Sequence, residues 1–173
     1  MNILITGGCG FVGSNIALNI KKNHPSFSVI AVDNLKRRGS ELNINRLLSV
    51  GIEFVHGDIR KAEDLDVAED IDLIIDAAAE PSVLAGLKGG TEYLYETNLT
   101  GTFNILNLAV KKKSKVIFLS TSRIYPIQNI LDSKIEETET RFQFAEESGV
   151  HGISSRNHIF EINRWNSFLL SLK

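Results

Sequence analysis

The chain contains a single cysteine, Cys9, among its 173 residues, so it can form neither an internal disulfide nor a cluster of thiolate metal ligands. We interpret Cys9 as a small side chain rather than a nucleophile. The sequence also lacks any run of about 20 apolar residues, the length that a membrane-spanning helix requires. Hydrophobic residues make up 43% of the chain, which is enough for one substantial core. These features predict a cytoplasmic globular protein.

The sequence also has no large excess of positively or negatively charged residues. The formal net charge is −2 at pH 7, which argues against non-specific binding to nucleic acid. The one dense run of charge, residues 111–115, falls at the end of a predicted helix, where cations are favoured. We interpret it as a solvated helix end. His151 and His158 lack the spacing of metal ligands, so no metal site is predicted.

Short apolar runs rich in valine and isoleucine alternate with segments of helical periodicity. The runs are typical of strands buried on both faces and lie at residues 2–6, 28–32, 52–55, 72–76 and 115–119. The helical segments lie at residues 12–22, 40–49, 62–69 and 91–112. Strand and helix in alternation predict an α/β fold with a doubly wound parallel sheet of the Rossmann type.

The turn after the first predicted strand is rich in glycine. It reads ITGGCGFVGSN and places glycines in the pattern Gly7-x-x-Gly10-x-x-Gly13. Glycine permits a tight turn and lacks the Cβ that would block a pyrophosphate, while the N-terminus of the following helix offers N–H groups to phosphates. Asp33 ends the second strand 20 residues after Gly13, where a carboxylate can bind a ribose diol. The pattern predicts a dinucleotide-binding site.

The surroundings of Asp33 bear on which dinucleotide binds. Its carboxylate would repel a 2′-phosphate, so we predict NAD as the cofactor. The cations Lys36, Arg37 and Arg38 follow closely and leave open the alternative that they hold such a phosphate. Asp58, in the stretch HGDIR, is placed either to bind the amino group of adenine or to cap the helix that follows.

Six stretches together resemble the extended short-chain dehydrogenase/reductase family of nucleotide-sugar epimerases and dehydratases. They are ITGGCGFVGSN, VDNLKRRG, HGDIR, DAAAEPSV, NLTGTFNIL and FLSTSRIYP, within about residues 1–150. VDNLKRRG and IEETETRF further resemble the CDP-paratose (CDP-tyvelose) 2-epimerases of that family. The resemblance implies that bound NAD takes a hydride from a nucleotide sugar, with a CDP-sugar favoured, and returns it to the other face. A homo-oligomer is also expected.

The resemblance implies the roles of individual residues. Those expected to bind the cofactor are Gly7, Gly10, Phe11, Val12, Gly13, Asp33, Asn34, Arg37, Asp58, Ile59, Ala77, Ala78, Ala79, Asn98 and Ser120. Thr121 matches the catalytic residue whose hydroxyl bonds the reacting sugar oxygen. Asp76 stands where many relatives have histidine.

The general base of the family, the tyrosine of a Tyr-x-x-x-Lys motif, has no match. None of the three tyrosines, Tyr93, Tyr95 and Tyr125, is followed by lysine four positions later. We therefore expect the chain as given to bind NAD without turning over a sugar.

The last residues of the sequence do not resemble the family. We predict a dinucleotide-binding domain at residues 1–154 and an atypical tail at 155–173, with no C-terminal substrate domain. A truncation, a change of reading frame near Ser155 or a genuine short variant would each account for the tail. The open sheet should then expose apolar surface. Three functions stay open: the cofactor domain of a nucleotide-sugar epimerase, a non-catalytic dinucleotide-binding module or sensor, and a dehydratase or reductase of the same superfamily.

Overall fold

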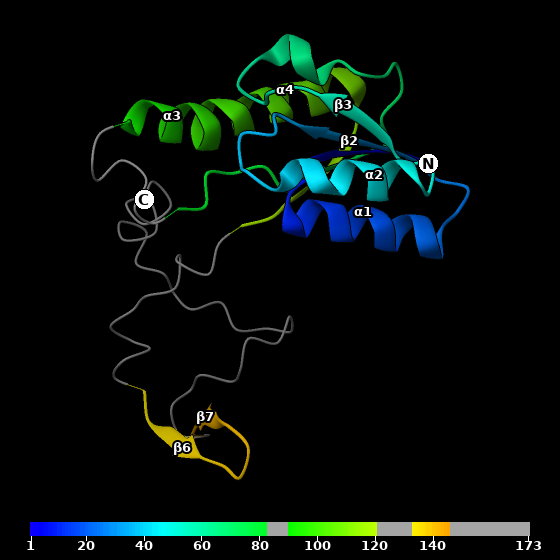
Figure 1. The fold of residues 1–173 in the computed structure, drawn as a ribbon. Coiled ribbons are helices and arrows are strands. Elements are labelled where there is room, and N and C mark those ends of the chain that lie inside the picture. Colours follow the sequence, from blue (N-terminus) through cyan, green and yellow to red (C-terminus); the bar gives the residue numbers. More distant parts are fainter. Residues whose placement is uncertain (83–89, 121–132, 146–173) are drawn as a thin grey trace. The chain divides into compact units, whose positions relative to one another are not determined.

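The computed structural model describes residues 1–82, 90–120 and 133–145. The chain divides into two compact units, residues 1–119 and residues 120–173, and each is described by itself. The first unit is built on a parallel sheet of five strands in the order β3-β2-β1-β4-β5 (Figure 1). The predicted doubly wound α/β fold is confirmed.

The strands of this sheet are short and mostly apolar. Their bounds are β1 Asn2–Thr6, β2 Ser28–Asp33, β3 Glu53–His56, β4 Leu73–Asp76 and β5 Lys115–Phe118. Each predicted strand is therefore found to within one residue at either end. Alternate side chains leave opposite faces of a strand, and in β1 this sends Ile3 and Ile5 to one face and Leu4 to the other. Both faces must consequently be covered.

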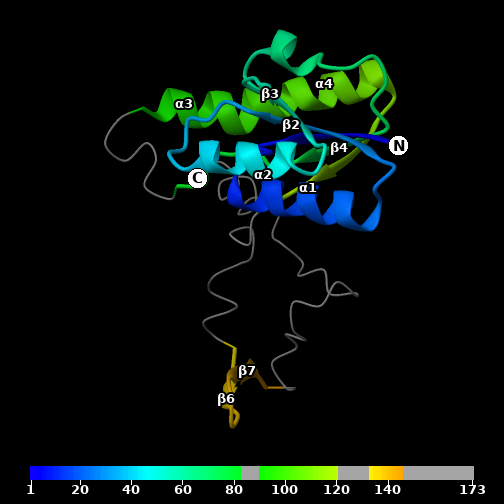
Figure 2. The ribbon, with the colours of Figure 1, turned by 45° about the vertical axis from the view of Figure 1, so that its right-hand side comes forward.

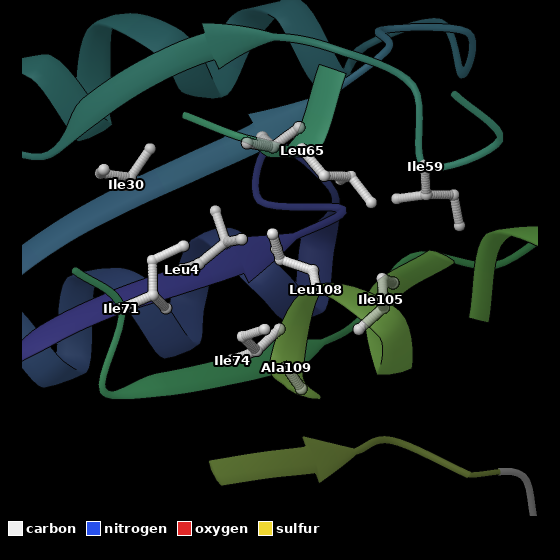
Figure 3. Packing of buried hydrophobic residues seen from close by; sticks show 10 residues of the cluster. Leu4, Ile30, Ile59, Leu65, Ile71, Ile74, Ile105, Leu108 and Ala109 are labelled. Atoms are coloured by element: carbon white, nitrogen blue, oxygen red, sulfur yellow. The ribbon is translucent and has the colours of Figure 1, made fainter. Parts of the chain in front are cut away.

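Helices cover the two faces of the sheet (Figures 1 and 2). On one face Ile3 and Ile5 pack with Ala17 of α1 (Phe11–Asn23) and Leu47 of α2 (Ile44–Leu48). On the other face Leu4 and Ile74 pack with Ile105, Leu108 and Ala109 of α4 (Thr102–Lys112), as Figure 3 shows. The two cores hold the carboxyl ends of β1 to β4 side by side.

The predicted helix at residues 62–69 is wrong beyond its first turn. Only a 3-10 turn, η2 (Ala62–Leu65), is present, because Asp66 leaves the helical conformation with φ −83° and ψ 60°. Its carboxylate pairs with Lys111 at 2.6 Å and Lys112 at 2.8 Å, and these hydrogen bonds lower the pKa of Asp66 to about 2. Lys111 and Lys112, at the end of α4, are thus ion-paired, where we had expected only a solvated helix end.

The helical segments predicted at residues 40–49 and 91–112 are present but irregular. Residues 40–49 divide into a 3-10 turn, η1 (Ser40–Asn43), and the short helix α2. Residues 91–112 are helical throughout, as α3 (Thr91–Tyr95), a π-helical segment η3 (Glu96–Gly101) and α4. Within the described part of the chain, no helix is long and apolar enough to cross a membrane.

The described residues 133–145 of the second unit form an antiparallel hairpin. Strand β6 (Ile135–Glu137) pairs with β7 (Phe142–Phe144), and the Thr138 N–H donates to the carbonyl of Arg141 at 2.9 Å. We predicted no strands here, because three-residue strands are too short to show an alternating pattern. The predicted catalytic Thr121 and the predicted boundary at residue 154 lie outside the described residues.

Apolar side chains are exposed along one edge of the first unit. In β5, the last strand of the sheet, Ile117 and Phe118 are about half exposed, and Phe103 and Val110 of α4 are more exposed still. An edge of this kind favours association with other apolar surfaces. Oligomerisation itself stays a prediction.

Leu4→Ala should destabilise the full chain much more than Leu42→Ala. Leu4 is fully buried between β1 and α4, whereas Leu42 is 74% exposed. We expect Leu4→Ala to lower the free energy of unfolding by about 2 to 5 kcal/mol and Leu42→Ala by less than about 0.5 kcal/mol. Urea unfolding followed by circular dichroism measures both values. Equal losses would contradict the two-faced core.

Candidate functional site

A cleft of about 900 Å³ opens at the carboxyl ends of the parallel strands. Its walls are the segments that follow β1, β2, β3 and β4, at residues 7–15, 33–40, 57–59 and 77–81. The strand order changes direction at β1, since β2 lies on one side of it and β4 on the other. Ligands of open α/β sheets bind at such a switch point. The first unit therefore has a binding cleft where the fold predicts one.

The glycines after β1 have different functions. Gly7 has a left-handed backbone (φ +64°), and a Cβ on Gly13 would collide with the carbonyl oxygen of Gly7. These two glycines let the turn fold tightly against the start of α1. A Cβ on Gly10, in contrast, would meet only the Gly7 oxygen, at 3.1 Å. Gly10 is thus the position at which a side chain would project into the cleft.

The N-terminus of α1 borders the same space. Helix α1 begins at Phe11, no side chain caps it and no acidic residue lies in its first turn. The first N–H groups of a helix have no acceptor within it, so those of Phe11, Val12 and Gly13 are available to a ligand. Phe11 and Val12 turn their side chains to solvent, with exposed fractions of 84% and 51%. This end of the helix can hold phosphate groups.

The carboxylate of Asp33 is held in a fixed orientation at the end of β2. Its Oδ2 accepts a hydrogen bond from the Cys9 N–H at 3.0 Å, and its Oδ1 accepts one from the Leu35 N–H at 2.8 Å. Each oxygen keeps a free lone pair for a ribose hydroxyl. Burial, together with the charge of Asp33, raises the pKa of the Cys9 thiol to about 12. Cys9 therefore stays protonated, as expected of a side chain that is not a nucleophile.

The three cations after Asp33 differ in their surroundings. The Nζ atom of Lys36 lies 3.2 Å from the centre of the Tyr93 ring, in a cation–π contact. Arg37 and Arg38 line the cleft and are exposed. The guanidinium of Arg60 also lies over the Tyr93 ring, with its central carbon 4.7 Å from the ring centre. Lys36 thus has an aromatic partner, and Arg37 and Arg38 are exposed residues of the cleft lining.

Asp58 does not cap the helical turn that follows it, so that alternative is wrong. The turn η2 begins at Ala62, and no side chain caps it. The Asp58 carboxylate instead accepts hydrogen bonds from Arg60, with Nη2 at 2.7 Å, and from Asn34 Nδ2 at 3.0 Å. Burial disfavours the charged form, but these bonds and the charge of Arg60 hold the pKa of Asp58 well below its usual range. An adenine amino group that bound Asp58 would have to share the carboxylate with Arg60 and Asn34.

Most of the predicted cofactor residues meet in the cleft. Those that line it are Gly7, Gly10, Phe11, Val12, Gly13, Asp33, Asn34, Arg37, Ile59, Ala77, Ala78 and Ala79. Asn98 is not part of the lining. Its Oδ1 accepts a hydrogen bond from the Glu80 N–H at 2.8 Å, and its Nδ2 donates one to the Glu80 carbonyl at 3.3 Å. Ser120 is exposed and belongs to the second unit. The roles of all these residues in cofactor binding, including those of Asp58, Asn98 and Ser120, stay predictions.

Sequence reasoning missed several residues at the cleft. Asn43 donates to the carbonyl of Cys9 at 2.9 Å and ties η1 to the glycine turn. Thr97, in the π-helical segment, lines the cleft and is 5% exposed, and its buried hydroxyl has no partner among the described residues. Tyr93 also lines the cleft. No local motif marks these three residues, because their positions depend on how η1, α3 and η3 pack.

A buried acid lies below the cleft. Asp76 is 1% exposed; its Oδ1 accepts hydrogen bonds from the Thr6 hydroxyl at 2.7 Å and the Ala78 N–H at 3.2 Å. Its Oδ2 has no partner among the described residues. Burial raises the pKa of this carboxyl, although the two hydrogen bonds oppose the shift. Asp76 therefore holds its proton to higher pH than an exposed aspartate.

The model of the NAD dependent epimerase/dehydratase family matches residues 3–153. The chain belongs to this family. CDP-paratose 2-epimerase of Salmonella typhi is 36% identical over 153 residues, which cover 82% of this chain and 42% of that protein. This family member spans only about two fifths of the length of the curated relatives that it matches.

Solved structures of relatives share the fold of this family member. A dTDP-glucose 4,6-dehydratase from Bacillus anthracis in complex with NAD has a TM-score of 0.62 and is 31% identical. The match covers 72% of this chain and 39% of the dehydratase chain. The ADP-L-glycero-D-manno-heptose-6-epimerase of Helicobacter pylori has a TM-score of 0.60 and 33% identity, covering 72% and 40%.

NAD is the cofactor of the family, and the cleft fits it. A Cβ on Gly10 would project into the space beside an uncapped helix N-terminus, as a pyrophosphate site requires. Asp33 offers an oriented carboxylate for a ribose. The unpartnered hydroxyl of Thr97 is a buried polar group that a bound ligand would satisfy.

Asp76→Asn should reduce the dependence of stability on pH. Because its pKa is raised on folding, the folded chain keeps a proton that the unfolded chain releases above about pH 4. The free energy of unfolding of the wild type therefore falls as the pH rises from about 4 to the raised pKa. The asparagine variant lacks this contribution, so its stability relative to the wild type should increase as the pH rises above about 4.5.

Urea unfolding across that range measures the difference. The exposed Asp70→Asn is the matched control and should follow the wild type at every pH. Parallel profiles for the wild type and Asp76→Asn would show that Asp76 ionises normally.

Proposed function

We propose that this chain is the NAD-binding domain of a nucleotide-sugar epimerase. The observation that carries the proposal is the glycine turn, open at Gly10 and facing an oriented Asp33, at the switch point of the sheet. Bound NAD supplies hydride transfer. The chain supplies the binding: the N–H groups at the start of α1 hold the pyrophosphate, and Asp33 accepts hydrogen bonds from the adenosine ribose. The small side chains at residues 77–79 leave room for the cofactor.

We propose that the complete enzyme acts on a CDP-linked sugar. The similarity to the Salmonella typhi CDP-paratose 2-epimerase supports this choice, as does the hairpin sequence IEETETRF. Thr121 is proposed to bond the reacting sugar oxygen. A homo-oligomer is supported by the exposed apolar residues of β5 and α4. A cytoplasmic location stays a prediction.

We expect NAD to bind at least about tenfold more tightly than NADP, which is about 1.4 kcal/mol. The Asp33 carboxylate would lie next to the 2′-phosphate and repel it. Asp33→Asn removes that charge while keeping an oxygen acceptor, so it should bring the two affinities closer together. Isothermal titration calorimetry with each dinucleotide measures both constants, and equal affinities for the wild type would contradict the assignment of Asp33.

Two glycine variants separate binding from folding in the same titration. Gly10→Ala should lose NAD binding with a smaller loss of stability than Gly13→Ala, because its methyl group contacts only the Gly7 oxygen, at 3.1 Å, and otherwise enters the pyrophosphate space. Gly13→Ala should instead lose stability, because its methyl group collides with the Gly7 carbonyl. Normal NAD binding by Gly10→Ala would place the cofactor elsewhere.

The chain as given should not turn over sugar nucleotides even with NAD bound. A positioned acid or base contributes about 10²- to 10⁴-fold to rate, and the sequence has no Tyr-x-x-x-Lys. The assay incubates the protein with NAD and CDP-, UDP- or dTDP-linked sugars and follows epimers by NMR. Sustained turnover that Thr121→Ala abolishes would refute this expectation. Stable NAD binding without turnover also fits the alternative of a non-catalytic module.

A further inference from the structure

The contact between Lys36 and Tyr93 connects two segments that are far apart in the sequence. Lys36 belongs to the segment after β2, and Tyr93 lies on helix α3, beyond β4. The Nζ atom of Lys36 is 3.2 Å from the ring centre, and both residues line the cleft. The ammonium therefore has a specific partner within the site, in contrast to a freely moving surface lysine.

Tyr93 is itself held in position by an ion-paired network. Arg60 lies over the Tyr93 ring and binds Asp58 at 2.7 Å and Glu96 at 2.9 Å. Asn34, two residues before Lys36, donates to the same Asp58 at 3.0 Å. The ring is thus supported from the segment after β3 and from the start of η3. A ring supported in this way presents a stable face to the ammonium group.

The position of Lys36 matters for the choice between NAD and NADP. Lys36 follows Asp33 by three residues, so it is the nearest cation in the sequence to the carboxylate that we propose binds the ribose. A 2′-phosphate on that ribose would compete with the Tyr93 ring for the Lys36 ammonium. Loss of a cation–π contact would reduce the affinity for NADP by about three- to tenfold. NAD has no phosphate there and leaves the contact intact.

We propose that Tyr93 is a specificity-determining residue, which favours NAD over NADP by retaining the Lys36 ammonium. The inference rests on the proposed function, since it assumes that a dinucleotide occupies this cleft. It adds a second cause of NAD preference to the repulsion by Asp33. Arg37 and Arg38, which have no cation–π contact among the described residues, are outside this mechanism.

The test measures the ratio of the dissociation constants for NADP and NAD by calorimetry on the full chain. Tyr93→Leu removes the ring and frees Lys36, so the ratio should fall by about three- to tenfold. Tyr93→Phe keeps the aromatic face and should keep the wild-type ratio. The double variant Lys36→Met/Tyr93→Leu has no ammonium to release, and its ratio should return toward that of the wild type.

The outcomes separate this inference from the proposed function. If the wild type binds neither dinucleotide, the proposed function is wrong. If it binds NAD but Tyr93→Leu leaves the ratio unchanged, the role of Tyr93 is refuted while the cleft assignment stands. A ratio that falls equally in Tyr93→Leu and in the double variant would also refute it, because the effect would not pass through Lys36. Melting temperatures of all variants show whether each is folded.

Discussion

Helix α1 can begin at Phe11 only because Gly13 has no side chain where it meets the carbonyl of Gly7. This close approach brings the helix N-terminus to the end of β1, in the middle of the sheet. It also leaves Cys9 between Asp33 and Asn43, which bind its N–H and its carbonyl. The turn is therefore held on both sides, and the cleft has a rigid centre.

The walls of the cleft are held by polar contacts between loops. On one side the Asp58–Arg60–Glu96 ion pairs connect the segment after β3 to η3, and Tyr93 packs against them. On the other, Asn98 binds the backbone of Glu80 and ties η3 to the segment after β4. Asp76 and Thr6 join β4 to β1 directly below. These contacts between the described residues give the cleft its form.

The cleft lies entirely within the first unit, and this divides the function of the family into two parts. The proposed cofactor site consists of residues that the structure describes, from the glycine turn to Tyr93. Thr121, which we propose bonds the sugar oxygen, lies outside the described residues, and the sequence has no match for the Tyr-x-x-x-Lys base.

The amino-acid sequence by itself determined the five strands of the sheet, the position of α1 and the dinucleotide cleft. Apolar runs specify buried strands, and glycine spacing specifies a turn, because both are properties of neighbouring residues. The sequence also placed Asp33 correctly at the end of β2.

Only the tertiary structure decided the contacts between distant residues. Asp66 leaves the helical conformation and its carboxylate binds Lys111 and Lys112. Asp58 binds Arg60 and Asn34 where a helix cap was one expectation. Lys36 faces Tyr93, a partner that no local pattern indicates. Such pairings depend on which loops the sheet brings together, and a charged side chain binds whichever partner folding places within its reach.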